Sequence, residues 1–273
     1  MRLINQKPGR AERVFLALLP FVALAVAYAV ASAIRRAGNP ADKLLPSLDA
    51  MGQAFWRMAF VPDKRSGDYL LWLDTADSLV RLGIGMAVSA GLALSLGIAI
   101  GFIPRIRAGL APFIFAVSLI PPITVLPILF IMFGLGETSK IMLIVLGTAP
   151  VMIRSAAQSV IDIPREQIVK AETLGASTWQ MVTRLALPQL LPKLMTALRL
   201  ALVPAWIFLI SAEAIASTSG LGYRIFLVRR YLAMDVILPY VAWITLLAFL
   251  IDRILLIGSR RMFCWAHLEG DAL

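Results

Sequence analysis

Residues 82–103 read LGIGMAVSAGLALSLGIAIGFI, a run of 22 residues without one charged side chain. A helix needs about 20 apolar residues to cross the hydrocarbon core of a bilayer. Because lipid offers no hydrogen bonds, a spanning segment must also satisfy its backbone groups internally, which a helix does. The run therefore predicts a transmembrane helix.

Further apolar segments of similar length lie on both sides of this run. They are Val14–Ile34, Leu110–Phe133, Ile141–Val160, Leu194–Ala216 and Val236–Ile257. Segments of about ten residues with alternating hydrophobicity, which are typical of membrane β-barrels, do not occur in the sequence. We therefore expect an all-α integral membrane protein with about six transmembrane helices.

The composition agrees with a membrane protein. Hydrophobic residues make up 60% of the chain and charged residues 15%, whereas soluble domains carry about 25% charged residues. The formal net charge is +10, but the basic residues lie mainly between the apolar segments, which favours membrane flanking over nucleic acid as a partner. The single cysteine, Cys264, and single histidine, His267, predict neither a disulfide framework nor a metal site, and they leave the redox compartment open.

The N-terminal segment resembles a signal peptide in one respect. Basic residues precede it, and Ala31-Ser32-Ala33 resembles a cleavage site. The uncharged run Val14–Ile34 is longer than the apolar core of a signal peptide, about 7–15 residues, so we expect it to be retained as a membrane anchor.

The remaining boundaries follow from the segments. We expect an N-terminal tail and first helix at 1–34, an external loop with interfacial helices such as Leu48–Phe60 at 35–81, a permease-like core at 82–261 and a tail at 262–273. The distribution of Lys and Arg favours cytoplasmic N- and C-termini.

Small residues and prolines mark two of the segments. Gly83, Ala87, Gly91, Ser95 and Ala99 recur every four residues, with a Gly97–Gly101 pair beside them, which predicts close helix packing within the chain or with another one. The segment Leu110–Phe133 should be kinked or broken, and it either lines the pathway of a solute or packs as a structural kink; its prolines are Pro112, Pro121, Pro122 and Pro127.

The connection at 161–193 is polar, and it reads IDIPREQIVKAETLGASTWQMVTRLALPQLLPK. Pro164 suits the start of a helix that continues through Arg165–Thr173, and Gly175 ends it. A short second helix, Ser177–Leu185, should follow before Pro188 and Pro192 turn the chain into the membrane. Two short helices that meet at a glycine form a protruding knob, which suits a groove on a soluble partner.

This connection resembles a known motif. Gly175, followed ten residues later by Leu185-Ala186-Leu187-Pro188, is similar to the "EAA" loop of bacterial ABC-importer permeases, E-A-A-x-x-x-G, nine residues, then I-x-L-P. Ala171 matches its third residue, whereas Val169 replaces the glutamate and Lys170 the second residue. The stretches KAETLGASTWQ, LPQLLPKLMTALRLAL and SAEAIASTSGLGYRI resemble the nitrate/sulfonate/taurine branch of these permeases.

The resemblance implies a type I ABC-importer permease of the bacterial inner membrane. Two permease chains, expected to be identical, would join two ATP-binding cassette subunits and an extracytoplasmic solute-binding protein, and they would import a nitrate-, sulfonate- or taurine-like or nitrogen-containing solute. ATP and Mg would bind to the partner ATPase, in agreement with the lack of a G-x-x-x-x-G-K-[ST] loop in this sequence. The residues implied in ATPase coupling are Ala171, Glu172, Leu174, Gly175, Ala176, Ser177, Thr178, Trp179, Leu187 and Pro188.

Charged residues within the apolar segments are candidates for function. Glu213 precedes Ser217–Gly220 and is expected to pair with an arginine such as Arg224, to line the pathway or to stabilise an outer gate. We expect Arg154 and Arg199 to reach the membrane interface with their long side chains. The pathway candidates are Pro121, Pro122, Pro127 and Glu213.

Two other functions remain open on the sequence. A secondary carrier usually needs buried acid or histidine relays and repeated halves, and we find no internal repeat. A membrane-embedded enzyme needs a cluster of catalytic groups, and the one histidine lies outside the apolar segments. We therefore expect a transport subunit that is not itself an enzyme.

Overall fold

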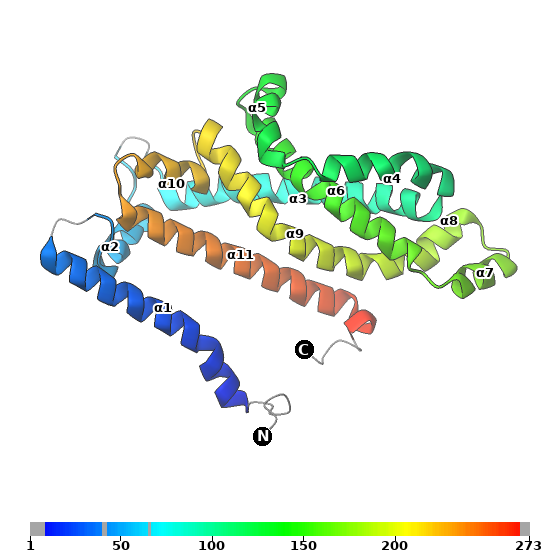
Figure 1. The fold of residues 1–273 in the computed structure, drawn as a ribbon, viewed down its shortest axis with the longest axis horizontal. Helices are drawn as coiled ribbons and strands as arrows, with labels where there is room; N and C mark the ends of the chain where they lie inside the picture. Colours follow the sequence, from blue (N-terminus) through cyan, green and yellow to red (C-terminus); the bar gives the residue numbers. More distant parts are fainter. Residues whose placement is uncertain (1–8, 40–42, 65–66, 268–273) are drawn as a thin grey trace.

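The computed structural model describes residues 9–39, 43–64 and 67–267, and these ranges hold helices and no strand. The predicted tails lie in part outside them, at 1–8 and 268–273. The elements run mainly along one long axis (Figure 1). They are α1 (Arg10–Gly38), α2 (Leu48–Phe60), α3 (Leu70–Phe102), α4 (Pro104–Ser118), α5 (Pro122–Phe133), α6 (Glu137–Ile161), α7 (Arg165–Thr173), α8 (Thr178–Gln180), the π-helical turn η2 (Met181–Ala186), α9 (Leu187–Ala216), α10 (Leu221–Arg229), α11 (Met234–Met262) and the 3-10 turn η3 (Cys264–His267).

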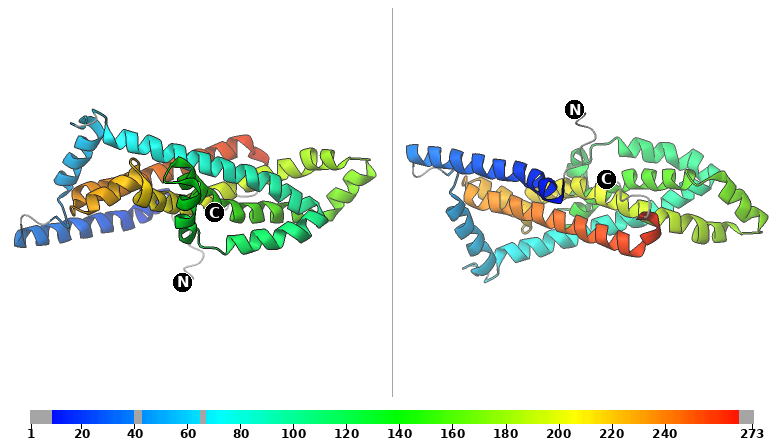
Figure 2. Two further views of the ribbon diagram at one scale, coloured as in Figure 1. Left: turned by 90° about the horizontal axis from the view of Figure 1, so that it is seen from above. Right: turned by 90° about the horizontal axis from the view of Figure 1, so that it is seen from below.

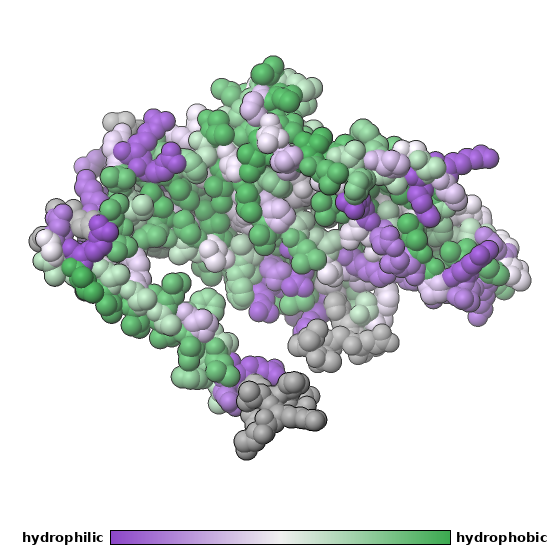
Figure 3. All heavy atoms as spheres, viewed as in Figure 1, coloured by the Kyte–Doolittle hydropathy of each residue, from purple (hydrophilic) through white to green (hydrophobic). Residues whose placement is uncertain are grey.

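The predicted all-helical membrane fold is confirmed. Five helical stretches of the described chain are long and apolar enough to cross a bilayer: α1, α3, α6, the continuous helix Thr178–Ala216, and α11. The bent pair of α4 and α5 counts as a sixth. In Figure 3, hydrophobic residues cover the middle of the visible face and hydrophilic residues gather toward the two ends of the molecule, as expected when the middle lies in lipid.

The core is built on close contact between α3 and α6. A Cβ atom added to Gly97 would lie 2.5 Å from Cβ of Ala156, and one added to Gly101 would collide with Val160. These glycines let the two backbones approach closely, so that van der Waals contact holds the helices together. The packing predicted for the Gly97–Gly101 pair is therefore confirmed.

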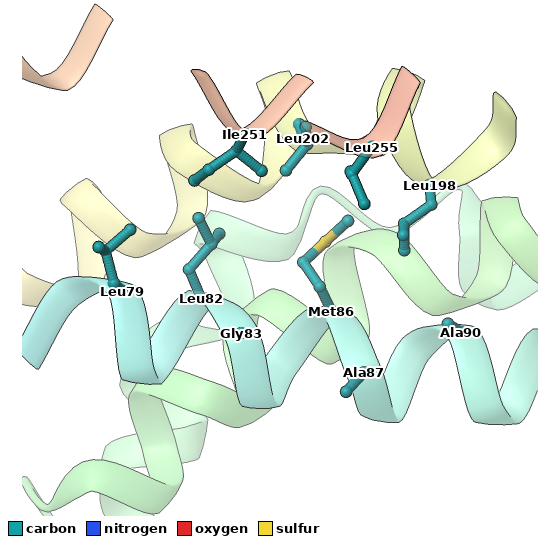
Figure 4. Close-up of a pocket in the computed structure, with 10 residues that line it drawn as sticks. All are labelled: Leu79, Leu82, Gly83, Met86, Ala87, Ala90, Leu198, Leu202, Ile251 and Leu255. Atoms are coloured by element: carbon teal, nitrogen blue, oxygen red, sulfur yellow. The ribbon is translucent and has the colours of Figure 1, made fainter. Parts of the chain in front are cut away.

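The neighbouring stripe of small residues faces outward instead. Gly83, Ala87, Gly91 and Ser95 are exposed, and a Cβ atom at Gly83 or Gly91 would meet nothing within 4 Å. Figure 4 shows Gly83 at the edge of an apolar groove of about 280 Å³, where leucines and Met86 of α3 face α9 and α11. Contact between this stripe and another chain stays a prediction.

The proline-rich segment is broken, as expected. The axes of α4 and α5 differ by 98°, and α5 projects from the side of the bundle (Figures 1 and 2). Pro121 has an extended backbone with φ −64° and ψ 116°, because the following Pro122 disfavours the helical conformation at the residue before it. The break therefore lies at the proline pair.

Two boundaries differ from the prediction. The helix α3 begins at Leu70 rather than Leu82, so residues 70–81 are helical and not part of the predicted loop. The helix predicted at Ser177–Leu185 does not end before Pro188, because the π-helical turn η2 joins α8 to α9 without a break. Pro188 lies in the first turn of α9 and Pro192 inside it, so neither turns the chain. The helix predicted at Leu48–Phe60 is confirmed as α2, and its place at the membrane interface stays a prediction.

Candidate functional site

The predicted coupling segment forms an exposed knob at one end of the molecule, where α7 and α8 meet (Figures 1 and 2). Neither helix contributes a buried residue. Leu174 is 79% exposed and Trp179 is 73% exposed, so two large apolar side chains stand in solvent. We call residues 165–180 the coupling knob. Its surface is open to a partner.

The backbone of the knob is fixed by local hydrogen bonds. Gly175 has φ +76°, a left-handed conformation that glycine adopts without cost. The N–H of Gly175 donates to the carbonyl of Glu172 over 2.9 Å, and that of Ala176 donates to the carbonyl of Ala171 over 3.0 Å. These bonds end α7 with satisfied carbonyls. Ala171, Glu172, Gly175 and Ala176 therefore form the turn.

A capping box begins the second helix of the knob. The Ser177 hydroxyl accepts from the N–H of Gln180 over 3.3 Å, and the Gln180 side chain accepts from the N–H of Ser177 over 2.9 Å. These bonds leave Thr178 and Trp179 in the exposed first turn of the helix. Local hydrogen bonds therefore define the backbone of the knob on both sides of Gly175.

Two of the predicted coupling residues lie away from the tip. Leu187 and Pro188 stand in the first turn of α9, where Leu187 is half-buried and Pro188 exposed. Beside them, the Gln189 amide donates to the Gln167 side chain over 2.9 Å, which ties the base of α7 to α9. Leu187 and Pro188 therefore belong to the support of the knob rather than to its apex.

The pathway candidates separate into two places. Pro121 and Pro127 are exposed and Pro122 is half-buried, all at or beyond the break between α4 and α5. Glu213 is fully buried, where its carboxylate accepts from Ser78 Oγ over 2.8 Å, from Arg81 Nη1 over 2.7 Å and from the N–H of Gly222 over 2.8 Å. A role of these four residues in the pathway stays a prediction.

Glu213 does not pair with Arg224, which was one of the expected partners. Arg224 Nε instead donates to Asp74 over 2.8 Å, and Tyr240 donates to the same carboxylate over 3.3 Å. The partner of Glu213 is Arg81, which the sequence analysis placed in the external loop. One ion pair joins α3 to α9 and the other joins α3 to α10.

The pairs belong to a larger cluster. Arg81 also binds Glu137 at the start of α6, and Lys140 donates to Glu137 over 2.9 Å. Lys140 and Arg81 further donate to Ser217 Oγ and to the carbonyl of Ser219, over 3.0 and 2.9 Å. Since a buried charge is costly without a partner, each supports the others. We call the six hydrogen-bonded charged residues the ion cluster: Asp74, Arg81, Glu137, Lys140, Glu213 and Arg224.

The backbone of Gly220 lies directly against this cluster. Its φ is +122°, and an added Cβ atom would lie 2.5 Å from Cδ of Glu213. Its N–H donates to Asp74 over 3.0 Å. The run Ser217–Gly220, which the sequence marks as a turn, thus supplies backbone and hydroxyl groups to the cluster, and no larger residue fits at Gly220.

The two arginines expected at the membrane interface behave differently. Arg199 forms a two-bond pair with Asp252 of α11, over 2.8 and 3.0 Å, so it joins two helices instead of reaching away from them. Arg154 is exposed, donates to Ser118 over 3.0 Å and lies 4.8 Å from the centre of the Phe115 ring. Asp252 was missed, although an acid within an apolar segment is a signal for a pair.

The described residues hold no group of three His, Cys, Asp or Glu side chains that could bind a metal ion. The charged residues of the ion cluster pair with one another.

Comparison with known proteins gives the family. Residues 91–263 match the family model described as "binding-protein-dependent transport system inner membrane component". The taurine transport system permease protein TauC of Escherichia coli (strain K12) is 37% identical over 198 residues, covering 72% of this chain and 72% of that protein. A putative aliphatic sulfonates transport permease protein of Bacillus subtilis (strain 168) is 28% identical, covering 70% of this chain and 69% of that protein.

The fold is also found among solved structures. A chain of a bacterial ABC transporter involved in the import of the acidic polysaccharide alginate aligns with a TM-score of 0.62 and 14% identity, covering 91% of this chain and 95% of that one. The family match and the taurine relative confirm the expected branch. The chain therefore belongs to the binding-protein-dependent transport system inner membrane components, the permease subunits of ABC importers.

Proposed function

We propose that this chain imports a small sulfonate-, nitrate- or taurine-like solute and that a separate ATPase drives it through the coupling knob. The observation that supports this most directly is the exposure of Leu174 and Trp179, at 79% and 73%, on a turn whose backbone is fixed by its own hydrogen bonds. A rigid turn with exposed apolar side chains suits a groove on a second protein, since little order is lost on binding.

The proposed assembly follows the family. Two copies of this chain form the membrane part, two ATPase subunits bind ATP and Mg and receive one knob each, and an extracytoplasmic binding protein delivers the solute. The N- and C-termini and the knob lie in the cytoplasm. ATP acts by stabilising one of two conformations of the permease pair.

The test uses the chain co-expressed with the ATPase of its transport system and reconstituted in proteoliposomes. Trp179→Ala removes the exposed aromatic group, and a central interface tryptophan contributes about 2 kcal/mol or more, so we expect at least a tenfold weaker association with the ATPase. The control is Trp56→Ala, which removes another exposed tryptophan, 62% exposed, on α2.

Three measurements test the proposed coupling to the ATPase. They are co-purification of the ATPase, ATP hydrolysis, and uptake of labelled taurine with its binding protein present. The proposal is supported if Trp179→Ala loses all three while its melting temperature and that of Trp56→Ala stay unchanged. Full ATPase association of Trp179→Ala contradicts the assignment of the knob. Uptake that persists after the ATPase is removed contradicts ATP-driven import and favours a secondary carrier.

A further inference from the structure

One face of α6 is exposed and polar in the second half of the helix. From Ser139 to Pro150 every residue is buried or half-buried, whereas Val151, Arg154, Ser155 and Gln158 are exposed. Their spacing of three and four residues places them on one side of the helix. Three of these four side chains are polar, which is unusual for a helix face in contact with lipid tails.

Arg154 on this face lacks a carboxylate partner. Arg81, Arg199 and Arg224 each form an ion pair, but no acid of the described chain pairs with Arg154. A guanidinium carries five N–H donors, and the bond to Ser118 uses one of them. The other donors are open to an external anion.

The side chain of Arg154 contacts the end of α4 that lies next to the break, at Ser118 and Phe115. Side chains on a helix lean toward its N-terminus, and the C-terminal end of α6 leads to the coupling knob. The partner Ser118 is the last residue of α4, about 20 Å along the helix from Pro104, where α4 begins. Ser118 and Phe115 thus hold the guanidinium beside the break between α4 and α5, and we infer that it lies within the membrane.

A pocket of about 260 Å³ lies beside this guanidinium, between α3, α4 and α6. Its polar lining comes from Arg107, Arg154 and Gln158. Arg107 is already occupied, because its guanidinium donates to the carbonyls of Ile100 and Gly101 at the end of α3. Arg154 therefore supplies the open N–H donors of the pocket, next to the break at Pro121 and Pro122, whereas the charged group of Arg107 faces carbonyl oxygens.

A charge at membrane depth is stable when it faces water or a counter-ion. Glu213 is the acid that the sequence analysis suggests for the pathway. It is buried and paired with Arg81, so its charge does not repel an anion. We propose that Arg154 is an anion-binding residue of the translocation pathway and takes the oxyanion group of the solute, a sulfonate or a carboxylate. This inference rests on the proposed importer function and names the residue of the pathway that selects charge.

The test places a cysteine next to Arg154 and reads its surroundings. In a Cys264→Ser background, which removes the single native cysteine, Ser155→Cys introduces one thiol on the same exposed face. The full chain in phosphatidylcholine nanodiscs is treated with two water-soluble reagents, sulfonatoethyl and trimethylammonioethyl methanethiosulfonate, which carry opposite charges. No ATPase or ATP is needed, so the outcome is independent of the coupling knob.

We expect the anionic reagent to react about five- to tenfold faster than the cationic one, since one positive charge lies beside the thiol. Arg154→Gln should remove most of this preference, leaving the smaller effect of Arg107, and Arg154→Lys should retain most of it. The matched control is Arg105→Gln, which removes the charge of another exposed arginine outside the pocket. Methanesulfonate should slow the reaction, whereas the neutral dimethyl sulfone should not.

Four results would overturn the inference. If neither reagent reacts, the face meets lipid or protein and not water. If Arg154→Gln keeps the preference, the charge of Arg154 does not set it. If methanesulfonate gives no protection, the solute class is wrong. If phosphatidylglycerol in the nanodiscs removes the preference, a lipid headgroup occupies the pocket.

Discussion

Arg81 of α3 and Glu213 of α9 form an ion pair of 2.7 Å in which the side chains are 4% and 0% exposed. The same guanidinium also binds Glu137 of α6. Three membrane helices are therefore joined at one side chain. Buried ion pairs are sensitive to the loss of one partner, because the other charge is left unpaired away from water.

Replacing Glu213 should destabilise the chain strongly. Glu213→Gln leaves Arg81 hydrogen-bonded to Glu137 alone among the carboxylates, with Asp77 4.0 Å away, and should lower the free energy of unfolding by about 3–5 kcal/mol. Thermal unfolding in detergent measures the effect, and the exposed Glu166→Gln on α7 is the control. An unchanged melting temperature for Glu213→Gln would contradict a structural role. The double variant Arg81→Met with Glu213→Leu should recover part of the loss, since it removes both charges.

Valine substitutions separate the two glycine-containing faces of α3. Gly97→Val should cost about 1–3 kcal/mol, because the new side chain collides with Ala156 of α6. Gly91→Val should change the melting temperature little, because its site is open. Equal losses in the two variants would show that the contact with α6 is not the cause. If Gly91→Val lowers the mass of the solubilised complex without lowering the melting temperature, the exposed stripe contacts a second chain.

The left-handed conformation of Gly175 predicts that substitutions there reduce ATP hydrolysis to different degrees. An added Cβ atom at Gly175 meets nothing within 4 Å, so a substitution there acts through the backbone alone. Gly175→Ala should strain the turn by about 1–2 kcal/mol and reduce solute-stimulated ATP hydrolysis, and Gly175→Asn should reduce it less, since asparagine tolerates φ above zero. Equal hydrolysis in both variants and the parent would argue that the turn conformation is irrelevant to coupling.

The pair of Arg199 and Asp252 predicts a charge-swap rescue. Asp252→Asn weakens a two-bond contact between α9 and α11 and should cost about 1 kcal/mol, the usual scale for polar contacts between membrane helices. The double variant Arg199→Asp with Asp252→Arg should restore most of the stability. A double variant no better than the worse single one would show that the pair is not coupled. Chemical unfolding in mixed micelles gives the comparison.

The sequence predicts the apolar spans well because lipid imposes a simple rule on length and composition. It also predicts the break at Pro121 and Pro122, since each proline lacks a backbone donor. The direction of α5 was not predictable, because proline removes a hydrogen bond without setting the angle of the next helix. The 98° between α4 and α5 depends on what each helix packs against.

The start of α3 was missed for a different reason. Asp74 and Arg81 make residues 70–81 appear polar, so the hydropathy of the segment favours a loop. Both charges are buried, and their partners Arg224 and Glu213 lie 150 and 132 residues away in the sequence. A pattern read along one chain does not show which distant charges meet. The knob could be predicted from the sequence because its glycine, its capping residues and its two short helices lie close together along the chain.

The close seam between α3 and α6 has a mechanical consequence. Gly97 and Gly101 press the backbones together toward one end, and Arg81 ties α3 to Glu137 near the other. We therefore expect α3 and α6 to move as one unit about 37 Å long, and α7 continues from α6 after three residues. If the proposed ATPase pushes on the knob, we expect this unit to tilt as a whole, so that a small tilt displaces the far end, where α5 is attached, by a larger distance.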